Sequence, residues 1–135
     1  GVQMELGSVA TPFEHRSFEE ERILCQRYYQ KILADSASEH LGLAVAVGSS
    51  LKYYIIFPLD GPMRTDPTLS YSDVSHFRAT LQHSNSNECT ALSIAYQHND
   101  RPMLGMTAGS NSAGTLRLFG FNGASTGYLA FDAEL

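Results

Sequence analysis

The sequence is poor in charged residues, and this shortage narrows the class of protein. Only 17% of its 135 residues are Asp, Glu, Lys or Arg, against about 25% in an average soluble domain. The nine Lys and Arg residues are scattered and the formal net charge is −5, so no basic stripe exists to neutralise a phosphate backbone. We expect no nucleic-acid partner, and a surface of Ser, Thr, Asn, Gln and Gly that suits another subunit or a sugar.

Cysteine is also scarce. The two cysteines, Cys25 and Cys89, are too few for the disulfide framework of a small secreted domain, and no Cys/His pair has zinc-site spacing. We expect two free thiols, with a mutual disulfide as the alternative. No apolar run reaches the roughly 18 residues of a membrane span, so we expect no membrane insertion. Because the sequence begins Gly-Val-Gln-Met-Glu without an initiator Met, we expect it to be the final part of a longer protein.

Known catalytic motifs are missing as well. The sequence contains no Gly-x-Ser-x-Gly elbow, Walker loop, dinucleotide fingerprint or His-Glu-x-x-His. Most Asp and Glu residues beyond residue 34 fall in predicted turns, where they usually solvate the chain, and no two of the five histidines stand two or four residues apart. We therefore expect no enzymatic activity, no cofactor and no metal.

The N-terminal part predicts a strand and a helix. Residues 2–6 alternate between apolar and polar side chains, as a half-buried strand does. Ser17 and Glu20 match a capping box, which predicts a helix over residues 18–28. Its apolar face would hold Cys25 in the core. The full predicted face is Phe18, Cys25, Tyr29 and Ile32. Beyond residue 28 the segment Tyr-Tyr-Gln-Lys-Ile-Leu fits a helix or a strand equally well.

The remainder of the sequence predicts β-structure. In residues 41–47 Leu and Val alternate with Gly and Ala, so one face is bulky and the other is bare enough for a second sheet or a symmetry mate. Residues 53–59 are apolar on both faces, which places this strand centrally or in an interface. A β-bulge is expected near Phe119. Further strands are predicted at residues 68–71, 74–81, 91–96, 103–107, 115–121 and 128–135.

Short strands separated by turns predict an antiparallel β-sandwich over residues 34–135. The two-sided strand 53–59 and the unpartnered strand 2–6 indicate a homotrimer with both segments near its axis. Polar groups concentrate in the turns 83–87, 98–101 and 109–114, where sugar recognition and plain turn chemistry are alternatives. The predicted ligand-binding residues are His83, Asn85, Asn87, Tyr96, Asn99, Asp100 and Asn111.

Three segments carry a resemblance. Residues 1–30, which include Leu24-Cys25-Gln26-Arg27-Tyr28-Tyr29, are similar to a junction in tail-fibre and related structural proteins of tailed bacteriophages. Residues 57–67, with Pro62-Met63-Arg64 and Pro67-Thr68, look like the rest of that pattern, as does the terminal Phe131-Asp132-Ala133-Glu134-Leu135. The loops over residues 83–111 match no family pattern.

This resemblance implies a domain organisation and a function. Residues 1–12 would end a preceding fibre region, residues 13–33 would link it by a helix, and residues 34–135 would form the tip domain. The implied protein is a homotrimeric virion component, assembled in the host cytoplasm, that attaches to host capsule or lipopolysaccharide. The alternative is an architectural trimerisation module without receptor contacts. The resemblance implies no catalytic residue.

Overall fold

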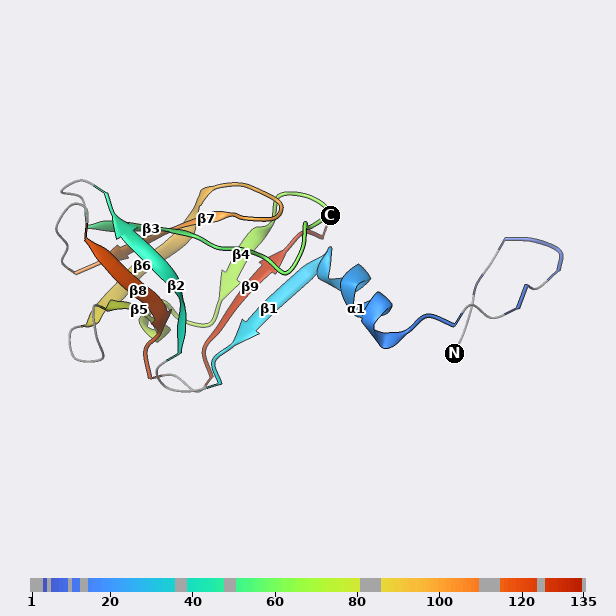
Figure 1. Ribbon diagram of the computed structural model, residues 1–135, viewed down its shortest axis with the longest axis horizontal. Helices are drawn as coiled ribbons and strands as arrows, with labels where there is room; N and C mark the ends of the chain where they lie inside the picture. Colours follow the sequence, from blue (N-terminus) through green and yellow to red (C-terminus); the bar gives the residue numbers. More distant parts are fainter. Residues whose placement is uncertain are drawn as a thin grey trace.

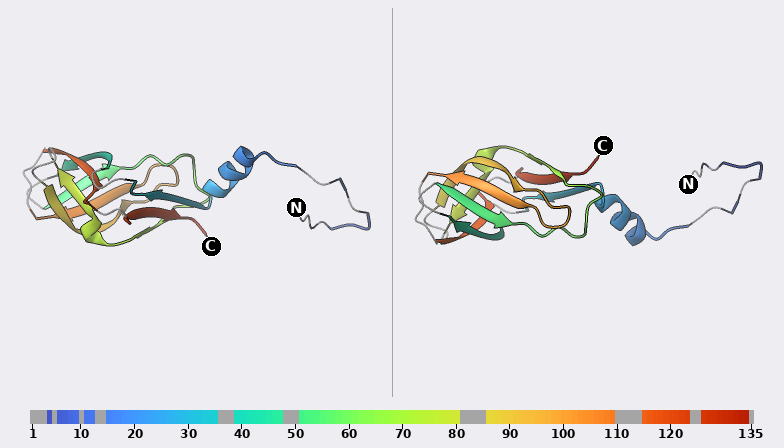
Figure 2. Two further views of the ribbon diagram at one scale, coloured as in Figure 1. Left: turned by 90° about the horizontal axis from the view of Figure 1, so that it is seen from below. Right: turned by 90° about the horizontal axis from the view of Figure 1, so that it is seen from above.

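The computed structural model describes residues 4, 6–9, 11–12, 15–35, 39–47, 51–80, 86–109, 115–123 and 126–134. The protein is mainly β, as the sequence predicts, and its strands form two antiparallel sheets (Figure 1). One sheet closes into a six-stranded barrel and the other has three strands. The molecule is elongated, with the barrel at one end and helix α1 projecting beyond the three-stranded sheet towards the other (Figure 2).

Each sheet has a fixed strand order. The three-stranded sheet runs β1 (Tyr29–Leu33), β9 (Tyr128–Asp132) and β4 (Thr68–Tyr71). The barrel runs β2 (His40–Ala46), β3 (Lys52–Ile56), β7 (Met103–Ala108), β6 (Ser86–Tyr96), β5 (Phe77–Thr80) and β8 (Leu116–Phe121). Strand β8 pairs with both β5 and β2. The predicted pair of antiparallel sheets is thus confirmed, and closure of the larger sheet leaves it no free edge.

The interior of the barrel explains the two faces of β2. Six strands enclose a narrow space, and large side chains fill it, with Phe77 stacked on Phe119 at a centroid distance of 5.8 Å. Only small side chains from β2 fit beside them, so Ala44 and Ala46 are buried. Leu43 then points outward and is 61% exposed. The bare face of β2 therefore packs inside the chain, and its bulky face is the exposed one.

The β-bulge predicted near Phe119 lies in the neighbouring strand. The register of β2 against β8 shifts between His40 and Gly42, opposite Gly120 and Phe119. The cause is the close approach of the chain at Gly120, where a Cβ atom would overlap the carbonyl oxygen of Glu39 and lie 2.9 Å from the Cα atom of His40. Glycine at this position lets the chain at the start of β2 pack directly against β8.

Several strand boundaries differ from the prediction. Residues Val74–His76 form a short 3-10 helix, η1, because the side chain of Asp73 accepts a hydrogen bond from the backbone N–H of Ser75 at 2.8 Å. Strand β6 begins at Ser86 instead of Ala91, so part of the turn predicted at residues 83–87 is strand. Strands β3 and β9 end at Ile56 and Asp132, before the predicted ends at residues 59 and 135.

Helix α1 (Phe18–Gln26) starts at the predicted capping box. Ser17 Oγ accepts a hydrogen bond from the N–H of Glu20 at 3.2 Å, and the Glu20 carboxylate accepts one from the N–H of Ser17 at 2.8 Å. The helix buries no residue, so the prediction that Cys25 lies in the core is wrong. The predicted apolar face does not exist because Tyr29 belongs to β1. The strand alternative for residues 29–33 is the correct one.

The predicted N-terminal strand is described only in part. Met4 and residues 6–9 belong to no strand, and residues 2, 3 and 5 lie outside the described residues.

Removal of the cap by Ser17→Ala is expected to fray α1 without lowering the melting temperature of the sheets. Loss of an N-cap costs about 1 kcal/mol of helix stability, but α1 buries no residue against the β-structure. Backbone chemical shifts of residues 18–26 measure the fraying, and a thermal melt followed by aromatic circular dichroism measures the sheets. Ser17→Asp, which retains a capping oxygen, is the control. A clear fall in melting temperature for Ser17→Ala alone would contradict this account of α1.

Three segments that lie far apart in the sequence meet beside the end of α1. The N–H of Arg64 donates to the carbonyl oxygen of Arg27 at 2.7 Å, and the N–H of Ala133 donates to that of Tyr28 at 2.8 Å. The guanidinium of Arg64 lies 5.8 Å from the centre of the Tyr28 ring. Buried Gln30 accepts from the N–H of Asp60 at 2.9 Å and fixes the adjoining loop. These are the three segments that carry the resemblance.

Both cysteines are free thiols, as predicted, but they differ in environment. Cys25 is exposed on α1, whereas Cys89 is buried in β6. Burial raises the pKa of the Cys89 thiol to about 11, although its hydrogen bond to the carbonyl of Ala91 acts in the opposite direction. Only the thiolate reacts with alkylating agents.

Iodoacetamide at pH 8 is therefore expected to label Cys25 in the native protein and to spare Cys89. A pKa of about 11 leaves a thiolate fraction of ~10⁻³ at that pH. Intact mass should show one label in the native state and two after unfolding in denaturant. The Cys25→Ser variant should show no label in the native state and one label after unfolding. Native double labelling, or a mass two hydrogens lighter with no label, would contradict the assignment.

Candidate functional site

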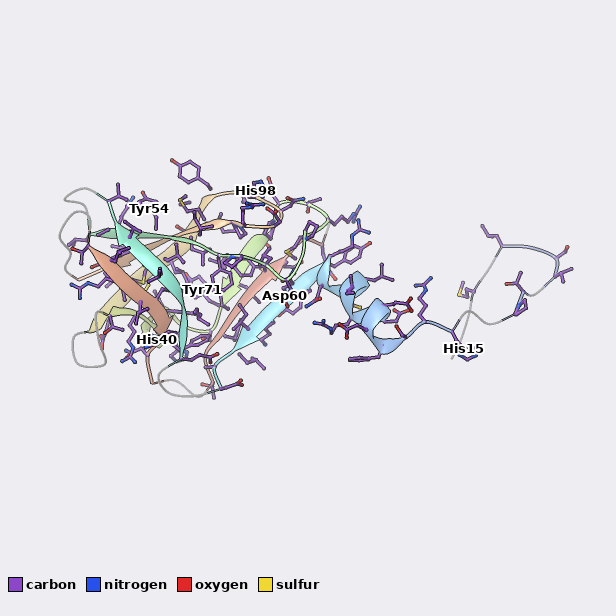
Figure 3. The ribbon with its side chains drawn as sticks, in the orientation of Figure 1. His15, His40, Tyr54, Asp60, Tyr71 and His98 are labelled. Atoms are coloured by element: carbon purple, nitrogen blue, oxygen red, sulfur yellow. The ribbon has the colours of Figure 1, made fainter. Side chains whose placement is uncertain are left out.

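A groove crosses the outer face of the barrel over strands β3, β7 and β6. Its volume is about 360 Å³. The residues that line it are Lys52, Tyr54, Ala91, Ser93, Ala95, Tyr96, Gly105 and Thr107. Figure 3 labels Tyr54, on β3, and His98, which follows β6 in the chain.

Strand register places these side chains in rows. Tyr54 on β3 lies opposite Gly105 on β7, which lies opposite Ser93 on β6. In the next row, Lys52 lies opposite Thr107, which lies opposite Ala91. Side chains that are directly opposite share a face of the sheet. The middle of the groove is consequently made of small residues, with the longer side chains of β3 along one side.

Gly105 forms the lowest part of the floor. A Cβ atom on Gly105 would lie 3.3 Å from the Cβ of Ala95, 3.9 Å from Ser93 Oγ and 3.9 Å from a ring carbon of Tyr54. The absence of that side chain keeps the backbone of β7 open to a ligand. Glycine within a strand often marks such a close approach.

Tyr96 closes one end of the groove. The register of β6 against β7 shifts between Ile94 and Tyr96, and both Ala95 and Tyr96 therefore face outward. The Tyr96 side chain is 67% exposed, which leaves its ring available as a stacking surface. Within the described part of the chain, the side-chain hydroxyls of the four groove residues that carry one make no hydrogen bond. These residues are Tyr54, Ser93, Tyr96 and Thr107.

The arrangement is suited to a hydroxylated ligand. Each hydroxyl group of Ser, Thr or Tyr both donates and accepts hydrogen bonds, and an aromatic ring offers an apolar face beside a polar tip. Sites for small ligands combine such apolar surfaces with a few placed polar groups. In contrast, no cluster of three or more His, Cys, Asp or Glu among the described residues could hold a metal ion.

Of the predicted ligand-binding residues, the structure places Tyr96 in the groove. Asn87 lies in strand β6, in register with Ala79, and not in a turn as predicted, because β6 extends further than its apolar pattern indicates. The side chain of Asn87 is outside what the structure describes, as are His83, Asn85 and Asn111.

Asn99 and Asp100 lie in the β6–β7 connection and do not line the groove. The side chain of Asn99 donates to the carbonyl oxygen of Met63 at 3.4 Å, and the carbonyl oxygen of Asp100 accepts from the N–H of Leu59 at 3.0 Å. Arg101 donates to the Asp100 carboxylate and, with nearby His98, lowers the pKa of that carboxyl group. These contacts hold two loops together and indicate a structural role.

Sequence reasoning missed most of the groove, namely Lys52, Tyr54, Ser93, Gly105 and Thr107. The predicted strands 91–96 and 103–107 carried a usable pattern, since their alternate positions Ala91, Ser93, Ala95, Gly105 and Thr107 are small or hydroxylated. Pairing the two strands as a hairpin would have placed these positions side by side.

Comparisons with protein-family models, with curated proteins and with solved structures found no match to this chain. The described residues contain no helix that is long and apolar enough to cross a membrane.

Proposed function

We propose that this chain is the receptor-binding tip of a bacteriophage tail fibre and attaches the virion to host surface polysaccharide. The observation that carries the proposal is the groove over β3, β7 and β6, which combines a bare floor at Gly105 with exposed Tyr96 and uncommitted hydroxyl groups. Sugars present hydroxyls at the rim of each ring and C–H groups on its faces, and the groove has partners for both.

The junction beside α1 supports the assignment to a tail fibre. The segments that resemble the bacteriophage proteins are joined by backbone hydrogen bonds from Arg64 to Arg27 and from Ala133 to Tyr28. A pattern spread over three distant segments that meet at one place is better explained by one inherited structural unit than by three unrelated coincidences. The groove lies over β3, β7 and β6, which belong to the barrel, whereas α1 lies at the far end of the three-stranded sheet (Figure 1).

Binding of the chain to a panel of capsular and lipopolysaccharide glycans tests the proposal. Tyr54→Ala and Tyr96→Ala are each expected to weaken binding to a recognised glycan about tenfold, because stacking on an aromatic ring and one hydroxyl contact are both lost. Tyr29→Ala is the matched control, since Tyr29 is 44% exposed and lies on the other sheet. Unchanged binding of both groove variants, or no binding to any glycan by the unaltered chain, would reject the proposal.

A second candidate is an architectural trimerisation module, which a patch of exposed apolar side chains favours. Leu43 and Val45 on β2 lie opposite Leu118 and Leu116 on β8, all on the outside of the barrel. We name these four residues the β2–β8 patch. Leu43 is 61% exposed and Leu116 is 56% exposed. Contiguous apolar surface of this kind usually marks an interface, and the occupant we propose is a second copy of the chain.

The two-sided apolar pattern of residues 53–59 is partly explained within the chain, since Tyr53, Ile55 and Phe57 are buried in it.

Light scattering is expected to show three times the 14.8 kDa mass of one chain. Leu43→Lys should shift the protein towards monomer because it places a charge in the β2–β8 patch. Lys31→Glu, a charge change on β1, should not do so. If the unaltered chain is a monomer in dilute solution, the trimer is rejected. If Leu43→Lys remains trimeric, the trimer interface does not include the β2–β8 patch.

A further inference from the structure

A row of exposed apolar side chains lies beside the groove on the outer face of the barrel. Ile56 on β3 lies opposite Met103 on β7, which lies opposite Tyr96 on β6. Ile56 is 63% exposed, Tyr96 is 67% exposed and Met103 is partly exposed. We name these three residues the apolar row. Residues that are opposite one another share a face of the sheet, so three strands contribute to one apolar surface.

The apolar row includes the part of strand β3 that packing within the chain leaves unexplained. Tyr54 and Ile56 are the outward residues of this strand. One exposed isoleucine is ordinary, because β-branched residues favour strands. Strand propensity acts on each residue separately, however, and does not align Ile56 with Met103 and Tyr96. Contiguous exposed apolar surface usually marks contact with another molecule.

The apolar row continues the groove. On β7 the outward positions are Thr107, Gly105 and Met103, in that order along the strand. Successive outward positions of a strand are about 7 Å apart, which is roughly the length of one sugar ring. Tyr96 belongs both to the row and to the lining of the groove. A ring above Gly105 therefore has a hydroxyl group at one end, on Thr107, and apolar side chains at the other.

We propose that the groove selects a sugar that carries a methyl group, either the C6 methyl of a 6-deoxyhexose or the methyl of an acetyl substituent. This inference rests on the proposed function and specifies its ligand. The sugar ring lies over the floor at Gly105, and its hydroxyl groups face Ser93 and Thr107. The methyl group lies on the side chains of Ile56 and Met103.

Burial of apolar surface gives this site its selectivity. Removal of one methyl group from water raises affinity about fourfold. A hydroxyl group in the same place would lose water, and Ile56 offers it no hydrogen bond while the Met103 sulfur is only a weak acceptor. The expected preference for the methyl-bearing sugar is therefore about fivefold per site. Several copies of the groove on one fibre would multiply it through avidity.

Matched sugar pairs provide the probe. L-rhamnose is compared with L-mannose, and L-fucose with L-galactose, because each pair differs only in a methyl or a hydroxymethyl group at C5. An O-acetylated capsular polysaccharide is compared with the same polysaccharide after mild alkaline removal of its acetyl groups. The full chain is the binding protein, and the amide shifts of Gly105 and Ser93 report occupancy of the groove. A preference within a sugar pair identifies a 6-deoxyhexose, and a preference for the acetylated polysaccharide alone identifies an acetyl group.

A variant of the apolar row tests which residues cause the preference. Ile56→Thr keeps a β-branched side chain, which suits a strand, but replaces part of the apolar contact with a hydroxyl group. Its affinity for the methyl-bearing ligand is expected to fall to that for the matched ligand without the methyl group. Leu33→Thr is the control, since Leu33 is 57% exposed on β1 of the other sheet, and it should retain the preference. Melting temperatures that match the unaltered chain exclude misfolding as the cause.

The outcomes separate the two proposals. Equal affinity within every pair, or a preference that Ile56→Thr retains, overturns the methyl-sugar inference while glycan binding stands. Binding of no sugar and no polysaccharide by the unaltered chain overturns the proposed function and the inference with it. A lower mass of Ile56→Thr in light scattering, with its ligand preference unchanged, would assign the apolar row to contact between copies and would also overturn the inference.

Discussion

Gly120→Ala is expected to destabilise the protein by about 3 kcal/mol or more, which corresponds to a fall in melting temperature of about 10 °C. The new Cβ atom would overlap the carbonyl oxygen of Glu39 and lie 2.9 Å from the Cα of His40. Both atoms belong to the backbone, so no side-chain rotation relieves the overlap. Relief requires β2 to move away from β8, which breaks the hydrogen bond from the N–H of Phe121 to that same Glu39 carbonyl.

Thermal and urea unfolding of the variant measure this effect. Gly61→Ala is the matched control, because a Cβ atom at Gly61 meets no atom within 4 Å. Surface substitutions of that kind usually change stability by less than about 0.5 kcal/mol. Equal stability of the Gly120 and Gly61 variants would show that the start of β2 does not approach Gly120 as closely as described.

Gly105→Leu is expected to weaken glycan binding by about tenfold or more, while the fold persists. The added side chain occupies the floor of the groove between Ser93 and Tyr54, where a ligand would lie. It points to the outside of the barrel and leaves the buried side chains in place. The nearest contact, 3.3 Å to the Cβ of Ala95, requires only a small adjustment of an exposed residue.

Isothermal titration with a recognised glycan, together with a thermal melt, checks this prediction. Gly105→Ala should show an intermediate loss because it fills the floor only in part. Gly109→Leu is the control, since a Cβ atom there meets no atom within 4 Å. Full affinity of Gly105→Leu would show that the ligand binds elsewhere, as on the loops proposed from the sequence.

The sequence predicted the class of fold because strand periodicity and turn residues are local signals. The alternation in residues 41–47 identified β2 correctly, but it did not tell which face is buried. That choice depends on the width of the barrel, since Phe77 and Phe119 leave room only for Ala44 and Ala46. Closure of a sheet is a property of all its strands and has no signature in any one of them.

In helix α1 the start was predictable from the sequence, but the packing of the helix was not. Its capping box is a local motif of two residues, Ser17 and Glu20, and was predicted correctly. Its apolar face was not, because the periodicity ran on into β1, where Gln30 is buried by contacts with the loop at Asp60. Apolar residues at helical spacing up to Ile32 fit one long helix as well as a helix followed by a strand, so the spacing alone did not separate α1 from β1.

The candidate site required pairing information that the sequence did not provide. The turns drew attention because Asn and Asp gather there, yet Asn99 and Asp100 are engaged in contacts between loops. The groove arises where the outward positions of three strands coincide, so that Tyr54, Gly105 and Ser93 form one row. Of the predicted residues, Tyr96 lines the groove because its strand ends there.

The central claim is that the groove over β3, β7 and β6 binds a glycan, and an NMR titration tests it most directly. A recognised oligosaccharide is added to the isotope-labelled chain and the amide resonances are followed. The account predicts that the largest shifts occur at Ser93, Tyr96, Gly105 and Thr107, and that these shifts disappear in Gly105→Leu. Shifts centred on other strands or on the β6–β7 connection at residues 98–101, with the groove resonances unchanged, would contradict it.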